Sequence, residues 1–146
     1  MFRKIERKLL EWKQNKNKKS LLITGARQIG KTYIVRKFAK ANYDHFIEIN
    51  FIKMPEAINI FKGNLDADTI MMNLTAFLRR SLSSGNTLIF FDEIKECPRA
   101  RTALKFLVED GRFDYICSGS LLGGNYKSIP SLPVGYESTL SKKISG

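Results

Sequence analysis

The stretch LLITGARQIGKT, residues 21–32, decides the fold of this chain of 146 residues. It places an apolar run before a loop with two glycines, and the helical pattern YIVRKFAKA follows it. A loop whose backbone N–H groups point inward around an anion must be free of side-chain obstruction and adopt unusual dihedral angles, and Gly25 and Gly30 permit both. The stretch therefore predicts a strand, an anion-binding loop and the first turn of a helix.

The end of this loop has the residue types that a triphosphate requires. A helix that begins near Lys31 adds unpaired N–H groups and the positive end of its dipole, and Lys31 adds a full charge for the outer phosphates. The hydroxyl of Thr32 is suited to ligate magnesium, as in the GxxxxGK[ST] pattern, which here follows a predicted strand. An incidental glycine-rich turn is the alternative. We expect ATP and Mg²⁺ as cofactors, bound by the run Gly25, Ala26, Arg27, Gln28, Ile29, Gly30, Lys31, Thr32 and Tyr33.

Length and composition indicate one soluble globular unit without a membrane span. No run approaches the roughly 18 apolar residues that cross a bilayer, and charges interrupt the N-terminal segment where a signal peptide needs an apolar stretch. We expect a cytoplasmic protein. Cys97 and Cys117 lack a CxxC spacing, and the lone His45 does not complete a zinc site with them, so both cysteines are expected to be reduced and structural.

The net charge of +11 is concentrated near the N-terminus, where the first twenty residues hold eight Lys or Arg and two Glu. Such a potential favours anionic partners, and nucleic acid, an anionic membrane surface and nucleotide phosphates all fit it. A solvated helix face followed by a lysine-rich linker is an equally simple interpretation. The charge by itself does not choose between them.

Apolar runs and helical patterns alternate along the chain. The predicted helices cover residues 2–12, 31–41, 67–82 and 99–110, and the predicted strands cover residues 21–24, 45–51, 87–91 and 113–118. Gly111 is placed where a helix C-terminal cap belongs. This alternation predicts an α/β fold, with a mostly parallel sheet and flanking crossover helices.

Two acids end the apolar run TLIFFDE, residues 87–93. If this strand lies beside the strand before the glycine loop, its carboxyl end reaches the magnesium. Asp92 would then be a metal ligand, and Glu93 would be the general base that deprotonates an attacking water. A polar pair that marks a strand end is the alternative. Two adjacent acids favour hydrolysis over transfer to a substrate hydroxyl, so we expect an ATPase rather than a small-molecule kinase.

The predicted strand YICS runs into SGSLLGG, which places Ser118 and Ser120 near the acids. A hydroxyl there is able to hydrogen-bond the attacking water or the terminal phosphate. Our catalytic set is therefore Glu93, Lys31 and Ser120, with Ser118 as the alternative serine. Serine and glycine are also ordinary turn residues after a strand.

With GARQIGKT, FFDEIKECPRA and SGSLLGG in this order, the chain resembles the AAA+ superfamily of P-loop ATPases. It is most similar to a bacterial and archaeal group whose longer members carry a C-terminal domain of unknown function. The resemblance implies a three-layer core, ATP and Mg²⁺ binding by the glycine loop (Walker A), a Walker B role for Asp92 and Glu93, and a sensor role for the serines.

Compared with that group, the chain is expected to lack the lid. We expect a basic N-terminal helix and linker at 1–19, the P-loop ATPase core at 20–124, and an irregular, truncated tail at 125–146. The last core strand is either present or lost. If it is lost, the strand at 21–24 becomes an edge that pairs with another chain, which predicts self-association. The alternative function is a truncated, catalytically weak module that binds nucleotide or nucleic acid.

Overall fold

The computed structural model describes residues 3–16, 18–24, 30–82, 85–119 and 131–133. Its α-helices are α1 (Arg3–Gln14), α2 (Lys31–Asn42), α3 (Ala67–Leu78) and α4 (Pro98–Asp110). Its strands are β1 (Leu21–Thr24), β2 (His45–Asn50), β3 (Thr87–Asp92), β4 (Asp114–Gly119) and β5 (Ser131–Pro133). Two short 3₁₀ helices, η1 (Pro55–Phe61) and η2 (Ile94–Glu96), complete the described elements.

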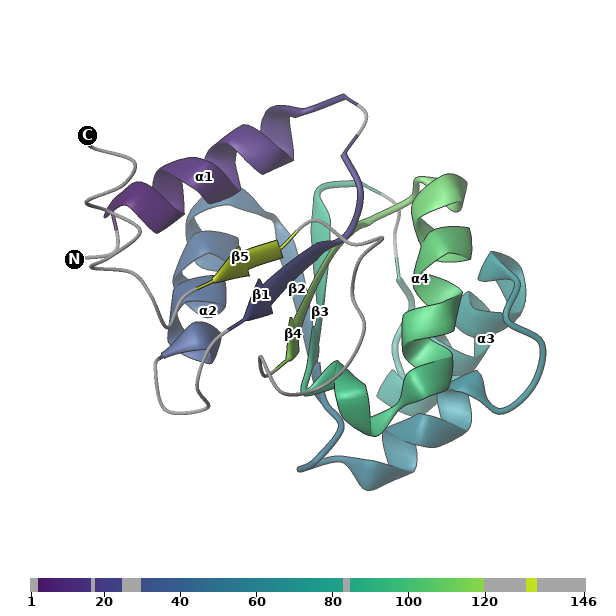
Figure 1. Ribbon diagram of the computed structural model, residues 1–146. Coiled ribbons are helices and arrows are strands. Elements are labelled where there is room, and N and C mark those ends of the chain that lie inside the picture. The colour runs from purple at the N-terminus through teal and green to yellow at the C-terminus, as the bar shows by residue number, and fades with distance from the viewer. Residues whose placement is uncertain (1–2, 17, 25–29, 83–84, 120–130, 134–146) are drawn as a thin grey trace.

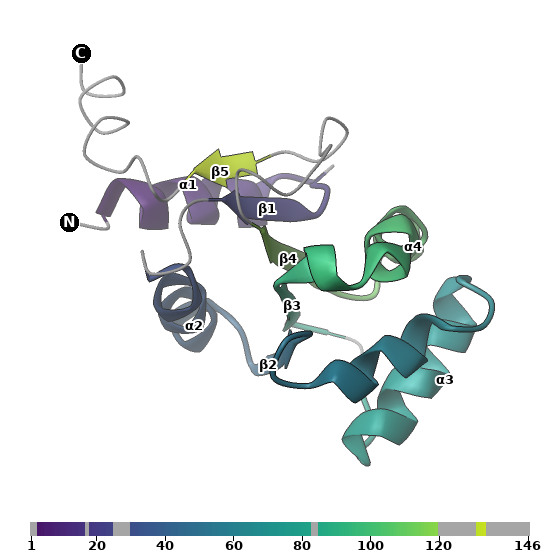
Figure 2. The same ribbon diagram turned by 60° about the horizontal axis from the view of Figure 1, so that its bottom comes forward.

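All strand pairs in the sheet are parallel, and the strand order is β2-β3-β4-β1-β5. Figures 1 and 2 show α1 and α2 on one face of this sheet and α3 and α4 on the other. The expected α/β architecture with three layers is therefore confirmed. None of the helices in the described part of the chain has the length and apolar character that crossing a bilayer requires.

Of the two possibilities left open for the last strand of the sheet, the structure shows that the strand is present. β5 pairs with β1 in parallel, with Leu22 opposite Ser131 and Thr24 opposite Pro133. β1 therefore has a neighbour on each side, and the argument for self-association through an exposed β1 edge no longer holds. The tail that we expected to be irregular contributes this strand. A three-residue strand that includes a proline has too short a pattern to be recognised from sequence.

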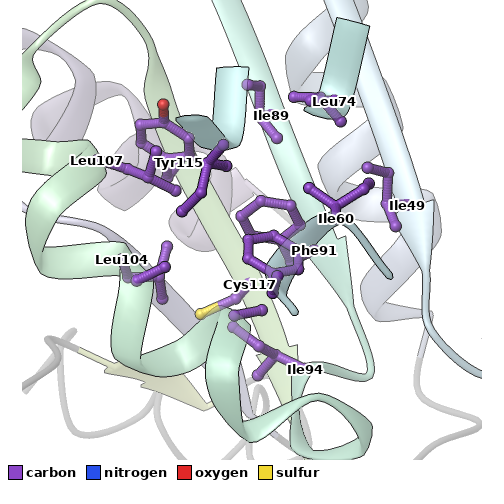
Figure 3. Packing of buried hydrophobic residues seen from close by; sticks show 14 of the residues in the cluster. Ile49, Ile60, Leu74, Ile89, Phe91, Ile94, Leu104, Leu107, Tyr115 and Cys117 are labelled. Carbon is purple, nitrogen blue, oxygen red and sulfur yellow. The ribbon is translucent and has the colours of Figure 1, made fainter. Parts of the chain in front are cut away.

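Alternation along the strands divides the core into two apolar clusters. Leu88 and Phe90 of β3 face the cluster that includes α1 and α2, whereas Ile89 and Phe91 face the cluster that includes α3 and α4. Figure 3 shows the second cluster, in which Phe91 stacks on Tyr115 of β4 with ring centroids 6.2 Å apart. Because both faces are covered, β3 is buried along its whole length.

The C-terminal end of α4 lies where the sequence predicted it, whereas the C-terminal end of α3 does not. Gly111 caps α4 in the left-handed conformation with φ 79°, as expected. The helix expected to reach residue 82 ends instead at Leu78, because Arg79 adopts the left-handed conformation (φ 57°) and its N–H donates to the Thr75 carbonyl. The helix η1 was not predicted.

The parallel arrangement brings the carboxyl ends of the strands to one edge of the sheet. In the described register, Asn50 lies opposite Asp92, and Thr24 lies opposite Gly119. β1 ends immediately before the glycine loop, and α2 begins immediately after it. This edge therefore holds Lys31, Thr32 and Asp92, which are predicted site residues within the described part of the chain.

Candidate functional site

The glycine loop ends at Gly30, which is the N-terminal cap of α2. Gly30 has φ 82° and ψ 24°, a left-handed conformation that glycine adopts without steric cost, and its carbonyl accepts from the Ile34 N–H at 3.0 Å. The other predicted loop residues, Gly25, Ala26, Arg27, Gln28 and Ile29, lie outside the described residues. The described part of the predicted loop is thus a left-handed glycine that opens a helix.

Lys31 is buried, with 4% of its surface exposed. Its Nζ donates to the Gly119 carbonyl at 3.1 Å, so the ammonium group lies at the carboxyl end of β4. Burying an ammonium group is unfavourable unless it is paired or hydrogen-bonded, which makes it uncommon outside functional sites. The next two predicted site residues of α2, Thr32 and Tyr33, differ in exposure. Thr32 is half-buried and faces the strand ends, whereas Tyr33 is 58% exposed.

Asp92 joins the start of α2 to the sheet. Its Oδ2 accepts from the Thr32 hydroxyl at 2.8 Å and from the Asn50 amide nitrogen at 3.2 Å. The carboxylate itself is buried, at 5% exposure. Residues that are 60 positions apart in sequence therefore meet at one side chain, as the two predicted metal ligands must if they share an ion.

Ser118 links the two acids. Its hydroxyl donates to Asp92 Oδ1, and its oxygen accepts from the Glu93 N–H at 2.9 Å. Ser118 is fully buried near the end of β4, directly before Gly119. Ser120, the serine chosen for the catalytic set, lies outside the described residues, so the described serine that contacts the acids is the alternative one.

Glu93 has an unusual backbone conformation at the point where β3 ends. Its φ is 57° and its ψ is 50°, a left-handed conformation that costs a residue with a side chain on the order of 1–2 kcal/mol. The side chain is 7% exposed, directly beside Asp92 in sequence. Backbone strain that the surrounding structure maintains is concentrated at functional sites. The left-handed conformation of Glu93 is therefore consistent with a functional role for this residue.

Sequence reasoning missed Asn50. Besides its bond to Asp92, its Oδ1 accepts from the backbone N–H groups of Ile52 and Lys53 at 2.9 and 3.0 Å. These two bonds form a turn that fixes the side chain at the end of β2. The sequence signal that could have identified Asn50 is its position as a polar residue at the end of a strand, because the same position identified Asp92.

A second cation lies near the acids on the surface. The Arg36 guanidinium donates to both carboxylate oxygens of Glu48 at 2.7 Å. The hydrogen bonds and charge of Glu48 raise the pKa of Arg36, and the negative charge of Asp92 contributes further in the same direction. Arg36 is therefore one cation of α2 that interacts electrostatically with Asp92.

The oxygen atoms of Thr32 and Asp92 are hard donors of the kind that Mg²⁺ prefers. Within the described ranges, no group of three or more His, Cys, Asp and Glu side chains comes together to form a metal cage. One or two protein oxygens are the donor set with which Mg²⁺ is usually held together with phosphate and water oxygens, whereas Zn²⁺ and Ca²⁺ usually take more protein ligands.

Comparison with known families agrees with this geometry. A family model described as AAA domain matches residues 17–141, a range that includes the glycine loop, both acids and the five strands of the described residues. A search of curated proteins finds no match. Since the family model covers most of the chain, and the sheet order and site geometry are those of an α/β nucleotide-binding fold, the chain belongs to the AAA domain family of nucleotide-binding P-loop proteins.

Proposed function

We propose that this protein binds ATP with Mg²⁺ at the carboxyl edge of the sheet and hydrolyses it. The observation that carries the proposal is the 2.8 Å hydrogen bond between the Thr32 hydroxyl and the Asp92 carboxylate. It brings a hydroxyl from the first turn after a glycine loop to an acid at the end of a neighbouring buried strand. Both groups supply the oxygen atoms that a phosphate-bound magnesium ion uses.

In this proposal the loop from Gly25 to Gly30 and the N-terminus of α2 hold the phosphates. The N–H groups at the start of the helix have no carbonyl partner within the helix and point along its axis, which suits phosphate oxygens. Lys31 exchanges its contact with the Gly119 carbonyl for the outer phosphates, or shares its donors between them.

Thr32 and Asp92 are the residues that would hold magnesium. The bound ion supplies positive charge that neutralises the phosphate oxygens. The remaining contacts of Asp92, to Ser118 and Asn50, keep the carboxylate oriented toward α2. Orientation by hydrogen-bonded neighbours is what makes a single carboxylate an effective ligand.

Hydrolysis assigns Glu93 the role of general base. A water oxygen attacks the terminal phosphorus, the bond from that phosphorus to the bridging oxygen breaks, and the water proton passes to the Glu93 carboxylate. The Ser118 hydroxyl oxygen accepts from the backbone N–H of Glu93, so Ser118 acts as a positioning residue for Glu93. The contact of Ser120 with the phosphate and the contact of Tyr33 with the nucleotide remain predictions.

Two variants with matched controls test the proposal. Lys31→Ala should weaken ATP binding at least about tenfold, because a charge-assisted hydrogen bond contributes about 1.5–3 kcal/mol. Lys40→Ala, which removes an exposed lysine from the same helix, should leave binding unchanged. Calorimetric titration with ATP, in magnesium and in EDTA, measures both.

Glu93→Gln should retain ATP binding while phosphate release falls by about 10²–10⁴-fold, the typical contribution of a general base. The control is Glu96→Gln, an exposed carboxylate on the neighbouring helix η2. Equal ATP affinity in Lys31→Ala and Lys40→Ala would contradict the binding site. Undiminished phosphate release in Glu93→Gln would contradict the assignment of the base and leave the binding site standing.

A further inference from the structure

Two side chains of α2 reach the sheet one helical turn apart. The Thr32 hydroxyl donates to Asp92 at 2.8 Å. The Arg36 guanidinium donates through Nε and Nη2 to the two carboxylate oxygens of Glu48, each at 2.7 Å. Residues four apart on a helix have their Cβ atoms about 5–6 Å apart on one face. Arg36 therefore lies on the same face of α2 as the predicted magnesium ligand of this helix.

The two carboxylates that these side chains reach also share one side of the sheet. Asn50 lies opposite Asp92 in the register of β2 and β3, and its amide nitrogen donates to Asp92 Oδ2 at 3.2 Å. Glu48 precedes Asn50 by two residues on β2, so both side chains are on the same sheet face, about 7 Å apart along the strand. That displacement is close to one helical turn. Glu48 therefore lies level with Arg36, one step back from Asp92.

Arg36 thus interacts with two carboxylates. The hydrogen bond and the charge of Glu48 raise the pKa of Arg36, and the charge of Asp92 raises it further. The Arg36 side chain is exposed, so packing does not fix its direction, whereas Asp92 is buried. A charge pair is stronger where water is partly excluded. Of these two acids, Asp92 is therefore the remaining partner for the guanidinium if Glu48 loses its charge.

A guanidinium on Asp92 would compete with a metal ion. An ionised carboxylate has about four acceptor positions, and the Asp92 oxygens already accept from Thr32, Asn50 and Ser118. A guanidinium takes two carboxylate positions at once when it binds in the bidentate manner, and its positive charge repels a neighbouring cation. The position of Arg36 therefore matters for any ion that Asp92 holds.

We propose that Glu48 is a positioning residue for the magnesium site, which holds Arg36 away from Asp92 and so keeps that carboxylate available to the ion. The inference rests on the proposed function, in which Asp92 is a magnesium ligand. Glu48 acts through Arg36 and does not touch the ion. The bidentate pair suits this role, because both guanidinium donors and both carboxylate oxygens are used in it.

The Mg²⁺ dependence of ATP binding tests the proposal. Calorimetric titration of the full chain with ATP, in EDTA and at a series of Mg²⁺ concentrations, gives the Mg²⁺ concentration that produces half of the gain in affinity. Glu48→Gln should raise this concentration about tenfold, because the ion must then displace a charge-assisted hydrogen bond. Arg36→Gln should leave it unchanged or lower it. A pair that only supports the helix would give the same loss in both variants, since either substitution breaks it.

The double variant Arg36→Gln/Glu48→Gln separates this role from the general attraction of the Glu48 charge for a cation. That attraction would make Glu48→Gln weaken Mg²⁺ by the same factor with or without Arg36, whereas we expect almost no effect once Arg36 is gone. The matched control is Glu6→Gln, which removes the carboxylate from a second ion pair of α2, with Lys37 at 2.9 Å, and should leave the Mg²⁺ dependence unchanged. Equal factors in the two backgrounds would overturn the proposal.

A measurement without nucleotide or metal keeps the two proposals apart. The Arg36 Nε–H gives an NMR signal while a hydrogen bond protects it from exchange with water. In EDTA this signal should persist at a new position in Glu48→Gln and be lost in Glu48→Gln/Asp92→Asn, whereas Asp92→Asn alone should keep the original signal. Loss of the signal in Glu48→Gln itself would refute the inference, because the guanidinium would then turn to solvent. If the unaltered chain binds no ATP in magnesium, the proposed function fails, and the NMR comparison still decides whether Glu48 holds Arg36 away from Asp92.

Discussion

The substitution Ser118→Ala should lower the free energy of unfolding by about 3 kcal/mol, the largest effect we expect from removing one oxygen atom in this protein. The hydroxyl donates to the buried Asp92 carboxylate, and such a bond to a charged group is worth about 1.5–3 kcal/mol. Its oxygen also accepts from the Glu93 N–H at 2.9 Å. Leaving that buried donor without its acceptor costs a further amount of about 1–3 kcal/mol. The estimate is near the lower end of the sum, because Asp92 keeps its bonds to Thr32 and Asn50.

Equilibrium unfolding in urea measures this change. A domain of ordinary stability, about 5–15 kcal/mol, stays folded after such a loss, and its urea midpoint should fall by roughly 1–3 M. Thr87→Val is the matched control. It removes a buried hydroxyl that has no partner in the described residues, so its midpoint should stay the same or rise.

The same variant should affect turnover more than binding. Ser118 anchors the left-handed backbone of Glu93, and without that anchor the carboxylate is held less firmly toward the attacking water. We expect phosphate release to fall at least about tenfold while ATP affinity changes less. Equal urea midpoints in Ser118→Ala and Thr87→Val would refute the reasoning, because they would mean that the two hydrogen bonds contribute nothing to the folded state.

Three further results are expected. Asn50→Ala should lower phosphate release and reduce the free energy of unfolding by about 1–2 kcal/mol, measured by urea unfolding, because Asp92 and two backbone N–H groups lose a partner. Gly111→Ala should destabilise the protein by about 1 kcal/mol in the same assay, since φ 79° strains any residue with a side chain, whereas Gly63→Ala should have a smaller effect. Burial raises the pKa of the Cys117 thiol to about 12, so the folded chain keeps a proton that the unfolded chain loses near pH 9, and stability should fall as pH rises from 9 toward 12. Replacing Cys117 with Ala should flatten that part of the pH profile.

The local pattern of apolar and polar residues was sufficient to predict most of the helices and strands. Helix and strand periods differ, so the alternation of the two predicted the order of α2, β2, α3, β3, α4 and β4. Runs of apolar residues without alternation, as in TLIFF, predicted strands covered on both faces. The motif GARQIGKT and the acids at the end of β3 predicted where the site lies, because carboxyl ends of parallel strands share an edge.

Only the tertiary structure decided which polar side chains meet there. Asn50 contacts Asp92 because β2 and β3 pair in a register that puts these two residues opposite each other, and that register depends on the packing of both sheet faces. Ser118 contacts both acids because β4 lies next to β3, which no local pattern specifies. β5 is only three residues long, too short for any period, and it becomes a strand because β1 offers it an unpaired edge. The sequence determined which segments are strands and helices, whereas contacts between residues far apart in the chain depend on the whole sheet packing at once.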